Sequence, residues 1–328
     1  MLKFDFTLQP GFDFMEAFSR TFGPQPVGNH LQFPADLGEG WIRTVAFSEG
    51  FRFTVHRYRL HEPLRLRRRV APGGHSHVVS FIFYASTAVP EARLHSSKEE
   101  YRRRAPSGIE VVSGDLNAEV LFPAGEEVFY GVAALSTDAL LHLLRENPRS
   151  EVLQTVVDAD ASFLYHEEMM PEAERLLQHL AEIDDHELLG NFYFRIKVEE
   201  LMYLVLHRLS KREAAGRREV GNADLEKLFR LRAHLLDDLS TPPRLPALAH
   251  AYQFSETRMK ALFKQVFGDT IYNYFQRARM QEAAARLREP GVSVSDVGYA
   301  LGFSNLSHFS RLFRRYYDLT PKRYAAVG

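Results

Sequence analysis

Apolar residues in about the last 80 positions follow a helical spacing that occurs twice. The first copy contains Leu248-Ala249, Phe254-Ser255, Met259, Leu262, Phe263, Gly268 and Tyr274. The second copy contains Val297-Gly298, Phe303-Ser304, Phe309, Leu312, Phe313, Asp318 and Tyr324. The offset between the copies is 49 residues at the first pairs and 50 at the last, so this is an internal repeat with one inserted residue.

Each copy predicts a short helix, a tight turn and a longer helix, because apolar positions recur at helical intervals on both sides of a break. In the second copy Gly302 supplies the positive φ that a sharp turn needs, and Ser304 is the expected N-cap of the longer helix. Gln253 stands at the equivalent position of the first copy. There the same conformation costs a residue other than glycine on the order of 1 kcal/mol.

A long helix is predicted between the copies, from Thr270 to Arg288, because this segment contains no proline or glycine. Its expected length is about 28 Å, and one turn of B-DNA is about 34 Å long. A rigid connection of this length can hold two recognition helices in successive major grooves. The repeat is therefore a candidate DNA-binding domain.

A β-rich segment is predicted before residue 134, where β-branched and aromatic residues alternate with polar ones in short runs. The runs are Trp41 to Phe47, Arg52 to Leu60, Arg65 to Val70, His77 to Ala85, Ile109 to Val112, Glu119 to Leu121 and Val128 to Ala133. Turn residues separate them, which is typical of a small barrel or sandwich. Residues 1–40 show no sustained period and predict an irregular arm with one short helix near Phe14 to Arg20.

Helical spacing returns after Ser136 and predicts helices at Thr137 to Arg145, Ser150 to Val157, Pro171 to Ile183 and His186 to Arg212. The last of these has an apolar stripe formed by Phe194, Val198, Leu201, Val205 and Leu209. A second apolar edge means that the helix buries two sides. We predict that the stripe is a subunit interface, and the alternative is a central core helix.

Lys211 to Asn222 is polar and contains two glycines, which is typical of a linker between domains. A leucine-rich helix is predicted from Asp224 to Leu239 and is expected to pack on the first repeat copy. The predicted fold class is an α+β multidomain protein. Residues 1–136 form a β barrel or sandwich with its arm, 137–212 a helical dimerisation segment, 213–222 a linker, and 223–328 an all-α domain with two helix-turn-helix motifs.

Composition and charge narrow the class of protein further. The chain has no cysteine, which excludes disulfides and thiolate chemistry and suits a reducing cytoplasm. We expect no secretory signal, because acidic residues and a proline-glycine break interrupt the first residues of the sequence. We expect no membrane span, because the longest apolar run, Val78 to Ala85, is too short. From Pro242 onward 13 Lys and Arg face 6 Asp and Glu, a balance of +7, whereas the preceding residues sum to −8. The repeat is the basic end, as phosphate binding requires.

The repeat resembles the DNA-binding domain of the AraC family of bacterial transcription regulators, most specifically from Val294 to Tyr324. The chain departs from the family pattern at Gly298, where alanine is usual, at Gln253, where glycine is usual, and at Ala325, where arginine is frequent. The resemblance implies sequence-specific binding to promoter DNA by a cytoplasmic homodimeric activator that works with RNA polymerase. It also implies a cupin-like β domain that binds a small effector, and no cofactor.

The resemblance assigns roles to residues opposite the buried face of each longer helix. The base-reading positions carried over through the repeat are Thr257, Lys260, Ala261, Leu306, Ser307, Ser310 and Arg311. Lys260 and Arg311 can donate to guanine, Arg311 with two hydrogen bonds. The positions expected at phosphates or at the groove edge are Glu256, Lys264, Arg277, Arg279, Arg314, Arg315 and Lys322.

Two further polar clusters were weighed as candidate sites. His75 and His77 would share a strand face, as the metal ligands of enzymatic cupins do, but no glutamate follows at the required interval, so we expect no metal. The run from Arg65 to Arg69 alternates with leucines, which favours the solvent-facing side of a strand over a nucleic-acid patch. No catalytic constellation stands out, and we expect no enzyme. A metal-dependent cupin enzyme fused to a DNA-binding domain and a ligand-independent DNA-binding protein are the alternatives.

The order of arm, Gly40-Trp41 step, β domain and the helix from Lys197 to Leu209 is similar to the AraC subgroup that senses siderophores. That resemblance implies an aromatic-lined cavity in residues 1–135, with a few basic side chains suited to an aryl ring and a carboxylate. The material for it is Phe47, Phe51, Phe53, Phe81, Phe83 and Phe122, with Arg52, Arg57 and Arg59 between them. Strand alternation sends Phe51 and Phe53 to one face and Arg52 to the other, so only part of this set can line one cavity.

Overall fold

The computed structural model describes residues 1–8, 11–70, 77–85, 91–93, 108–145, 148–158, 160–184, 188–212 and 220–327. The chain divides into two compact units, Met1–Glu226 and Lys227–Gly328. The division falls inside helix α6, which spans Asn222–Asp237, and most of the predicted linker lies outside the described residues. Among the described helices, none is both long and apolar enough to cross a membrane.

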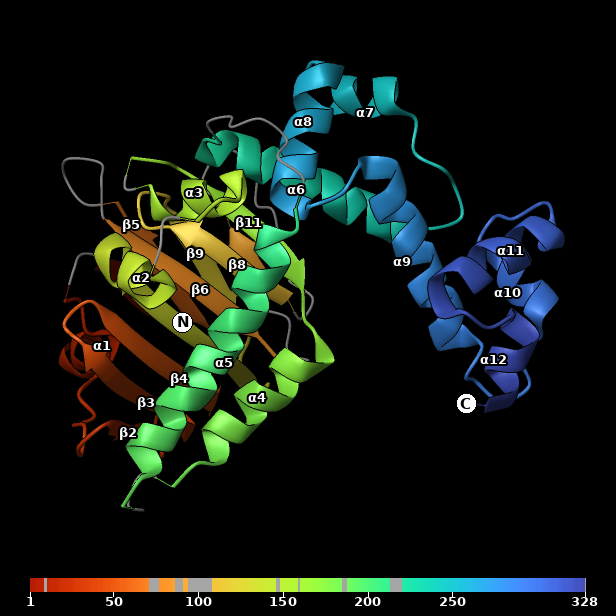
Figure 1. Cartoon of the computed structure of the whole chain (residues 1–328). Coiled ribbons are helices and arrows are strands. Elements are labelled where there is room, and N and C mark those ends of the chain that lie inside the picture. Colours follow the sequence, from red (N-terminus) through yellow and green to blue (C-terminus); the bar gives the residue numbers. More distant parts are fainter. Residues whose placement is uncertain are drawn as a thin grey trace. The chain divides into compact units, whose positions relative to one another are not determined.

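The amino-terminal unit contains two β-sheets (Figure 1). The seven-stranded sheet is antiparallel throughout, with the order β11-β8-β6-β10-β4-β3-β2. The four-stranded sheet has the order β1-β5-β9-β7. The strands are β1 Leu2–Thr7, β2 His30–Gln32, β3 Gly38–Ser48, β4 Phe51–Leu60, β5 Leu64–Arg69, β6 Val78–Tyr84, β7 Glu91–Arg93, β8 Gly108–Ser113, β9 Ala118–Phe122, β10 Val128–Ser136 and β11 Leu164–Glu168. The predicted amino-terminal β domain is confirmed.

Strand alternation gives the large sheet two different faces. On β4, Phe51 and Phe53 face one side, whereas Arg52 and His56 face an internal cavity on the other. This confirms the separation that alternation predicts. It also corrects the expected lining of the cavity, because only Phe122 of the six proposed phenylalanines lines it and the others pack on the opposite side of the sheet.

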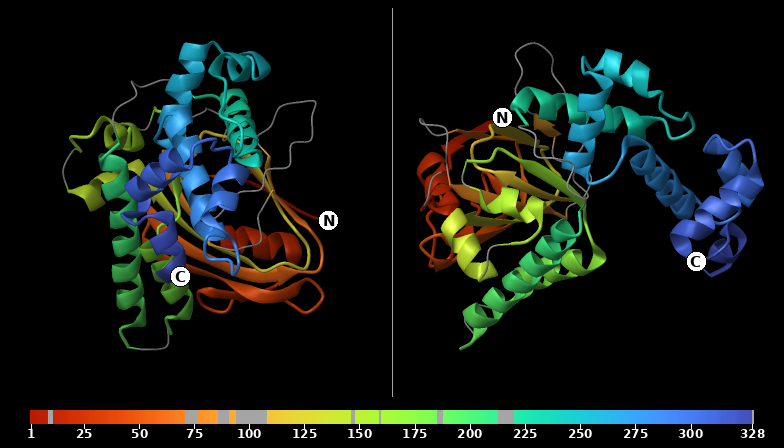
Figure 2. Two further views of the ribbon diagram at one scale, coloured as in Figure 1. Left: turned by 90° about the vertical axis from the view of Figure 1, so that its right-hand side faces the viewer. Right: turned by 45° about the horizontal axis from the view of Figure 1, so that its top comes forward.

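Helices cover both sides of the large sheet (Figure 2). Helices α4 (Pro171–Glu182) and α5 (Gly190–Ser210) pack on one side, and α1 (Phe14–Phe22) contributes to the core on the other. Two shorter helices, α2 (Thr137–Leu144) and α3 (Glu151–Val157), belong to the same side as α5. The internal cavity therefore lies between the two sheets, on the side away from α5.

The first 40 residues form part of the β domain, which corrects the predicted irregular arm. Strand β1 pairs in parallel with β5 along its whole length. Asp13 caps α1 by accepting a hydrogen bond from the Glu16 amide, and the ring of Phe18 contacts that of Phe4 on β1. Because Phe4 and Phe18 are both buried, this segment closes one wall of the core.

Helix α5 is a core helix, which corrects the predicted subunit interface. The five predicted interface residues are all 0% exposed within the unit: Phe194, Val198, Leu201, Val205 and Leu209. They share one hydrophobic core with the large sheet and α4, because that sheet offers a continuous apolar face to the stripe. The exposed apolar residues of α5 lie elsewhere on the helix, at Phe192, Tyr193, Ile196 and Tyr203.

The carboxy-terminal unit is helical in its described part. After α6 it contains α7 Leu245–Ala251, α8 Glu256–Phe267, α9 Ile271–Arg286, α10 Val294–Ala300, α11 Leu306–Tyr317 and α12 Pro321–Val327. As predicted, α6 packs on the first repeat copy, where Phe229 contacts Phe267 and Arg232 donates to the Tyr274 hydroxyl at 2.5 Å. The second copy has its own core around Phe309 and Phe313.

Candidate nucleic-acid interface

Each repeat copy folds as a helix-turn-helix, formed by α7 with α8 and by α10 with α11. Gln253 in the first turn has a φ of 55°, and Gly302 in the second has a φ of 76°. The left-handed turn expected at both positions is therefore present, and glutamine carries the strain in the first copy. A Cβ on Gly302 would lie 1.9 Å from the carbonyl oxygen of Ser240, so the second turn has room for glycine alone.

The longer helix of each motif begins with a side-chain cap. Ser255 accepts a hydrogen bond from the Arg258 amide at 3.3 Å, and Asn305 accepts one from the His308 amide at 3.1 Å. Asn305 is thus the N-cap of α11, which corrects the assignment to Ser304. The cause is the inserted residue, since Asn305 follows Ser255 at the longer offset of 50 residues.

Helix α9 connects the two motifs and is shorter than predicted. Its 16 residues span about 24 Å. In Figure 1, α7 and α8 lie near its first end and α10 to α12 near its last. Tyr274 contacts Phe263 of the first motif, and Met280 belongs to the core of the second. One helix therefore contributes to the cores of both motifs.

The residues predicted to read bases lie on the solvent side of α8 and α11, with one exception. Thr257, Lys260, Ser307 and Arg311 are exposed, and Ala261 and Ser310 are half-buried. Leu306 instead packs on α10, because its Cδ2 lies 2.6 Å from where a Cβ on Gly298 would be. Gly298, which stands where alanine is usual, thus makes room for Leu306.

The predicted groove-edge residues of the two recognition helices are accessible. Arg314 and Arg315 are exposed on α11, whereas Glu256 and Lys264 on α8 are half-buried. Lys260 forms an ion pair with Glu256 at 2.7 Å within α8. Because an exposed pair of this kind contributes little free energy, Lys260 can exchange it for DNA.

Arg279 is buried, which corrects its predicted phosphate contact. Its side chain donates a hydrogen bond to the carbonyl oxygen of Leu301, and its guanidinium lies 3.9 Å from the centre of the Phe303 ring. Burial lowers the pKa of Arg279 from its ordinary value. This arginine therefore holds the end of α10 and the start of the second turn, where a cation next to free helix carbonyls is favourable.

The remaining basic residues differ in how accessible they are. Arg277 is half-buried and pairs with Asp269 at 3.1 Å. Lys322 on α12 is exposed, as a phosphate contact requires. Arg258 on α8 and Arg323 on α12 are exposed too, although the sequence did not single them out. The sequence offered one signal for them, because Arg258 and Arg323 directly follow Thr257 and Lys322, which were predicted to contact DNA.

The candidate metal ligands are only partly within the described residues. His75 lies outside them, and His77 is exposed just before β6 with a φ of 47°. Among the residues that the structure describes, no group of three or more His, Cys, Asp or Glu is placed to hold a metal ion.

Comparison with known proteins identifies the repeat. A family model described as a helix-turn-helix domain matches residues 248–326, which include both motifs. PqrA of Proteus vulgaris, described as a probable transcription factor, is 28% identical over 85 residues, 26% of this chain and 70% of PqrA. The transcriptional activator RhaS of Escherichia coli is 34% identical over 96 residues, 29% of this chain and 34% of RhaS. The chain carries an AraC-type DNA-binding domain.

This AraC-type domain covers a minor part of the chain. The chain spans about a third of the length of RhaS. A solved regulator with an AraC-type DNA-binding domain, from Chromobacterium violaceum, is 26% identical, with 31% of this chain and 91% of that chain covered and a TM-score of 0.30. PqrA and RhaS are both named as transcription proteins.

Proposed function

We propose that the protein is an AraC-type transcription regulator that binds promoter DNA sequence-specifically through α8 and α11. The observation that carries this proposal is the pair of capped recognition helices within one helical unit. Lys260 and Arg311 are exposed there, opposite the buried Met259 and Phe309. The excess of basic residues in this unit favours a polyanionic partner.

The contacts that we propose follow from exposure and chemistry. Arg311 binds guanine with two hydrogen bonds, and Lys260 donates to guanine or to a neighbouring acceptor. Thr257, Ser307 and Ser310 lie beside them and contribute shorter contacts. Arg314, Arg315 and Lys322 bind phosphates, which position the helices without reading sequence.

Selection of bound sites from a random DNA library, followed by footprinting with the full chain, tests this function. We expect two conserved blocks about 10 base pairs apart, one for each recognition helix. Footprint protection without enrichment of any sequence would instead support the alternative of a ligand-independent DNA-binding protein.

The proposed regulator also binds a small effector in its amino-terminal unit. A cavity lies between the two sheets, and Leu225 of α6 lines it. The same helix continues into the carboxy-terminal unit, where Leu228 and Leu231 are buried. A ligand that alters the packing of Leu225 therefore acts on a helix that the DNA-binding unit shares. The relatives, named as a transcription factor and an activator, favour activation of transcription over enzymatic activity. The proposal includes RNA polymerase as a partner and a cytoplasmic location.

The regulator is further proposed to be a homodimer that pairs through the exposed face of α5. Phe192 is 62% exposed, Ile196 43% and Tyr203 60%, and their spacing places them along one side of the helix. Two pairs of opposite charge flank this side, Arg195 with Glu199 and Lys197 with Glu200. A face that carries both signs beside an apolar stripe is complementary to a second copy of itself.

The variant Ile196→Glu is expected to yield a folded monomer, because the charge falls in the apolar centre of the proposed contact. Sedimentation velocity of the natural chain and of this variant measures the change in mass. Gln178→Glu, which adds the same charge at an exposed position of α4 outside the stripe, is the control and should leave the mass unchanged. A natural chain that is monomeric at micromolar concentration, or an Ile196→Glu protein that is still dimeric, would exclude this interface.

A further inference from the structure

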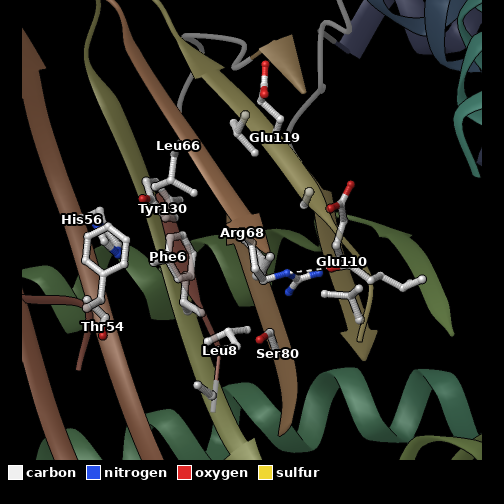
Figure 3. Close-up of a pocket in the computed structure, with 18 of the residues that line it drawn as sticks. Phe6, Leu8, Thr54, His56, Leu66, Arg68, Ser80, Glu110, Glu119 and Tyr130 are labelled. Carbon is white, nitrogen blue, oxygen red and sulfur yellow. Dashed lines mark hydrogen bonds between the residues drawn. The ribbon is translucent and has the colours of Figure 1, made fainter. Parts of the chain in front are cut away.

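The cavity of the amino-terminal unit combines aromatic walls with one buried cation. It encloses about 130 Å³ between the two sheets, and Figure 3 shows a part of its lining. Phe6 and Phe14 enter it from the amino-terminal segment, and Phe122 and Tyr130 from the sheets. Most of this surface is apolar, so a ligand gains free energy by placing an apolar body here.

Arg68 is the fully buried cation of this cavity, which the partly exposed Arg52, paired with Asp13, also lines. Because Arg68 has the same parity on β5 as Leu64 and Leu66, its side chain points inward and is only 5% exposed. This corrects the interpretation of the whole arginine run as the wet side of a strand. In Figure 3 the guanidinium reaches across the cavity in the direction of Glu110, with Ser80 beside it.

The guanidinium of Arg68 has unused hydrogen-bonding capacity. Its Nε donates to the carbonyl oxygen of Leu116 at 3.0 Å. In the part of the chain that the structure describes, its two terminal nitrogens take part in no hydrogen bond. Burial lowers the pKa of Arg68, and the nearby carboxylates of Glu110 and Asp115 oppose that shift. A buried cation with free donors is costly unless an anionic partner completes it.

The opposite wall of the cavity provides a flat apolar stack. The rings of His56 and Tyr130 are parallel, with centres 4.1 Å apart, and Phe122 stacks on Tyr130 at 5.3 Å. Burial lowers the pKa of His56 to about 3, so this ring is neutral at physiological pH and adds no second positive charge. Its Nδ1 is buried and makes no hydrogen bond to a described residue. The stack therefore offers ring surface and one polar atom to a planar ligand.

The volume of the cavity favours a small ligand. A cavity of about 150 Å³ is known to hold one benzene molecule, and the volume here is about 130 Å³. One aromatic ring with a small substituent fits this space. A ferric aryl siderophore with several rings exceeds this volume.

We propose that this cavity binds a single-ring aromatic carboxylate, with its ring against the stack of His56, Tyr130 and Phe122 and its carboxylate on the free nitrogens of Arg68. The proposal rests on the effector-binding function above and names the chemical class of that effector. A carboxylate matches the fork of donors on a guanidinium, which accounts for arginine at this position.

Calorimetric titration of the full chain at pH 7 tests this class with benzoate, its neutral isostere benzamide and the cation benzylamine. We expect benzoate to bind about 10- to 100-fold more tightly than benzamide, as a charge-assisted hydrogen bond predicts. Benzylamine should not bind detectably. Equal affinity for benzoate and benzamide, tighter binding of benzylamine on Glu110, or no binding of any of the three would overturn the proposal. Tighter binding of a ferric aryl siderophore than of benzoate would overturn the preference for a small ligand.

Variants of two neighbouring arginines assign the anchor. Arg68→Met should remove the preference for benzoate over benzamide, and Arg68→Lys should keep part of it because the charge remains without the fork. Arg69→Met is the matched control, since Arg69 lies on the same strand, is exposed and pairs with Asp5. An Arg68→Met protein that folds and still prefers benzoate would refute the anchor. The calorimetric titration contains no DNA, so a negative result there does not contradict the proposed DNA-binding function. A failure to select a DNA site likewise does not contradict the proposed ligand class.

Discussion

Replacing Leu201 with glutamate is expected to unfold the amino-terminal unit. Leu201 is 0% exposed in the core between α5 and the large sheet. Loss of a buried leucine costs about 2 to 5 kcal/mol, and a carboxylate in the core costs several kcal/mol more, even after relaxation. Together these approach the whole stability of a typical domain, about 5 to 15 kcal/mol. The single tryptophan, Trp41, lies on β3 of the same unit, so its fluorescence reports the loss of structure.

Gln178→Glu is the matched control for this result, because it places the same charge at an exposed position of α4, outside the core and outside the proposed dimer contact. Its free energy of unfolding should change by less than about 1 kcal/mol. A Leu201→Glu protein with native Trp41 emission and a cooperative thermal transition would show that this side of α5 is not part of the core. That result would instead support the prediction that the apolar stripe of α5 is a subunit interface.

Gly302→Ala is expected to destabilise the second helix-turn-helix severely. The residue has a φ of 76°, and an added Cβ would meet the Ser240 carbonyl oxygen at 1.9 Å. Positive φ costs alanine about 1 to 2 kcal/mol, and overpacking against rigid backbone adds about 1 to 3 kcal/mol. Thermal denaturation followed by far-ultraviolet circular dichroism should show an earlier loss of helix. Trp41 fluorescence should be unchanged in the same protein, because it reports the other unit.

The reverse change in the first motif is the control for the turn. Gln253 has a φ of 55°, so Gln253→Gly relieves strain and should stabilise the unit by about 0.5 to 1 kcal/mol. If Gly302→Ala lowers the free energy of unfolding and Gln253→Gly raises it, the two effects come from backbone strain and not from a general sensitivity of the domain to substitution. A stable Gly302→Ala protein would contradict the tight turn between α10 and α11.

The spacing of apolar residues predicted the helices and strands of this protein better than it predicted which other elements pack on them. The spacing of Phe194, Val198 and Leu201 correctly marks one side of α5 as apolar. Whether a sheet or a second subunit covers that side depends on distant residues, among them Phe53 and Phe83, which share its core. Helical spacing along one segment carries no information about such partners.

Alternation was a better guide than composition in two segments of the chain. Leu2, Phe4 and Phe6 alternate with polar residues, which is the pattern of a strand, but the nearby proline and glycine suggested an arm. Arg68 shares its parity with Leu66 and therefore points inward, but the run of charge around it suggested solvent. In both segments the period of two was the correct guide.

The exposed side of α8 and α11 was largely predictable because the repeat fixes which side of each helix is buried. The exceptions among the predicted DNA-binding residues depend on tertiary contacts. Arg279 is buried because Leu301 and Phe303 lie beside it, and Leu306 turns to α10 because Gly298 lacks a side chain. The charge and spacing of residues in the sequence do not reveal these neighbours.

Competition between specific and random DNA for the Arg311→Ala protein tests the central proposal most directly. Loss of one guanine contact should weaken a selected site by about 1 to 3 kcal/mol and leave binding to random DNA nearly unchanged. Lys322→Ala is the comparison variant, and it should weaken both DNAs equally and lower the slope of log K against log salt by about 0.9. Equal losses on specific and random DNA for Arg311→Ala would contradict base reading by α11.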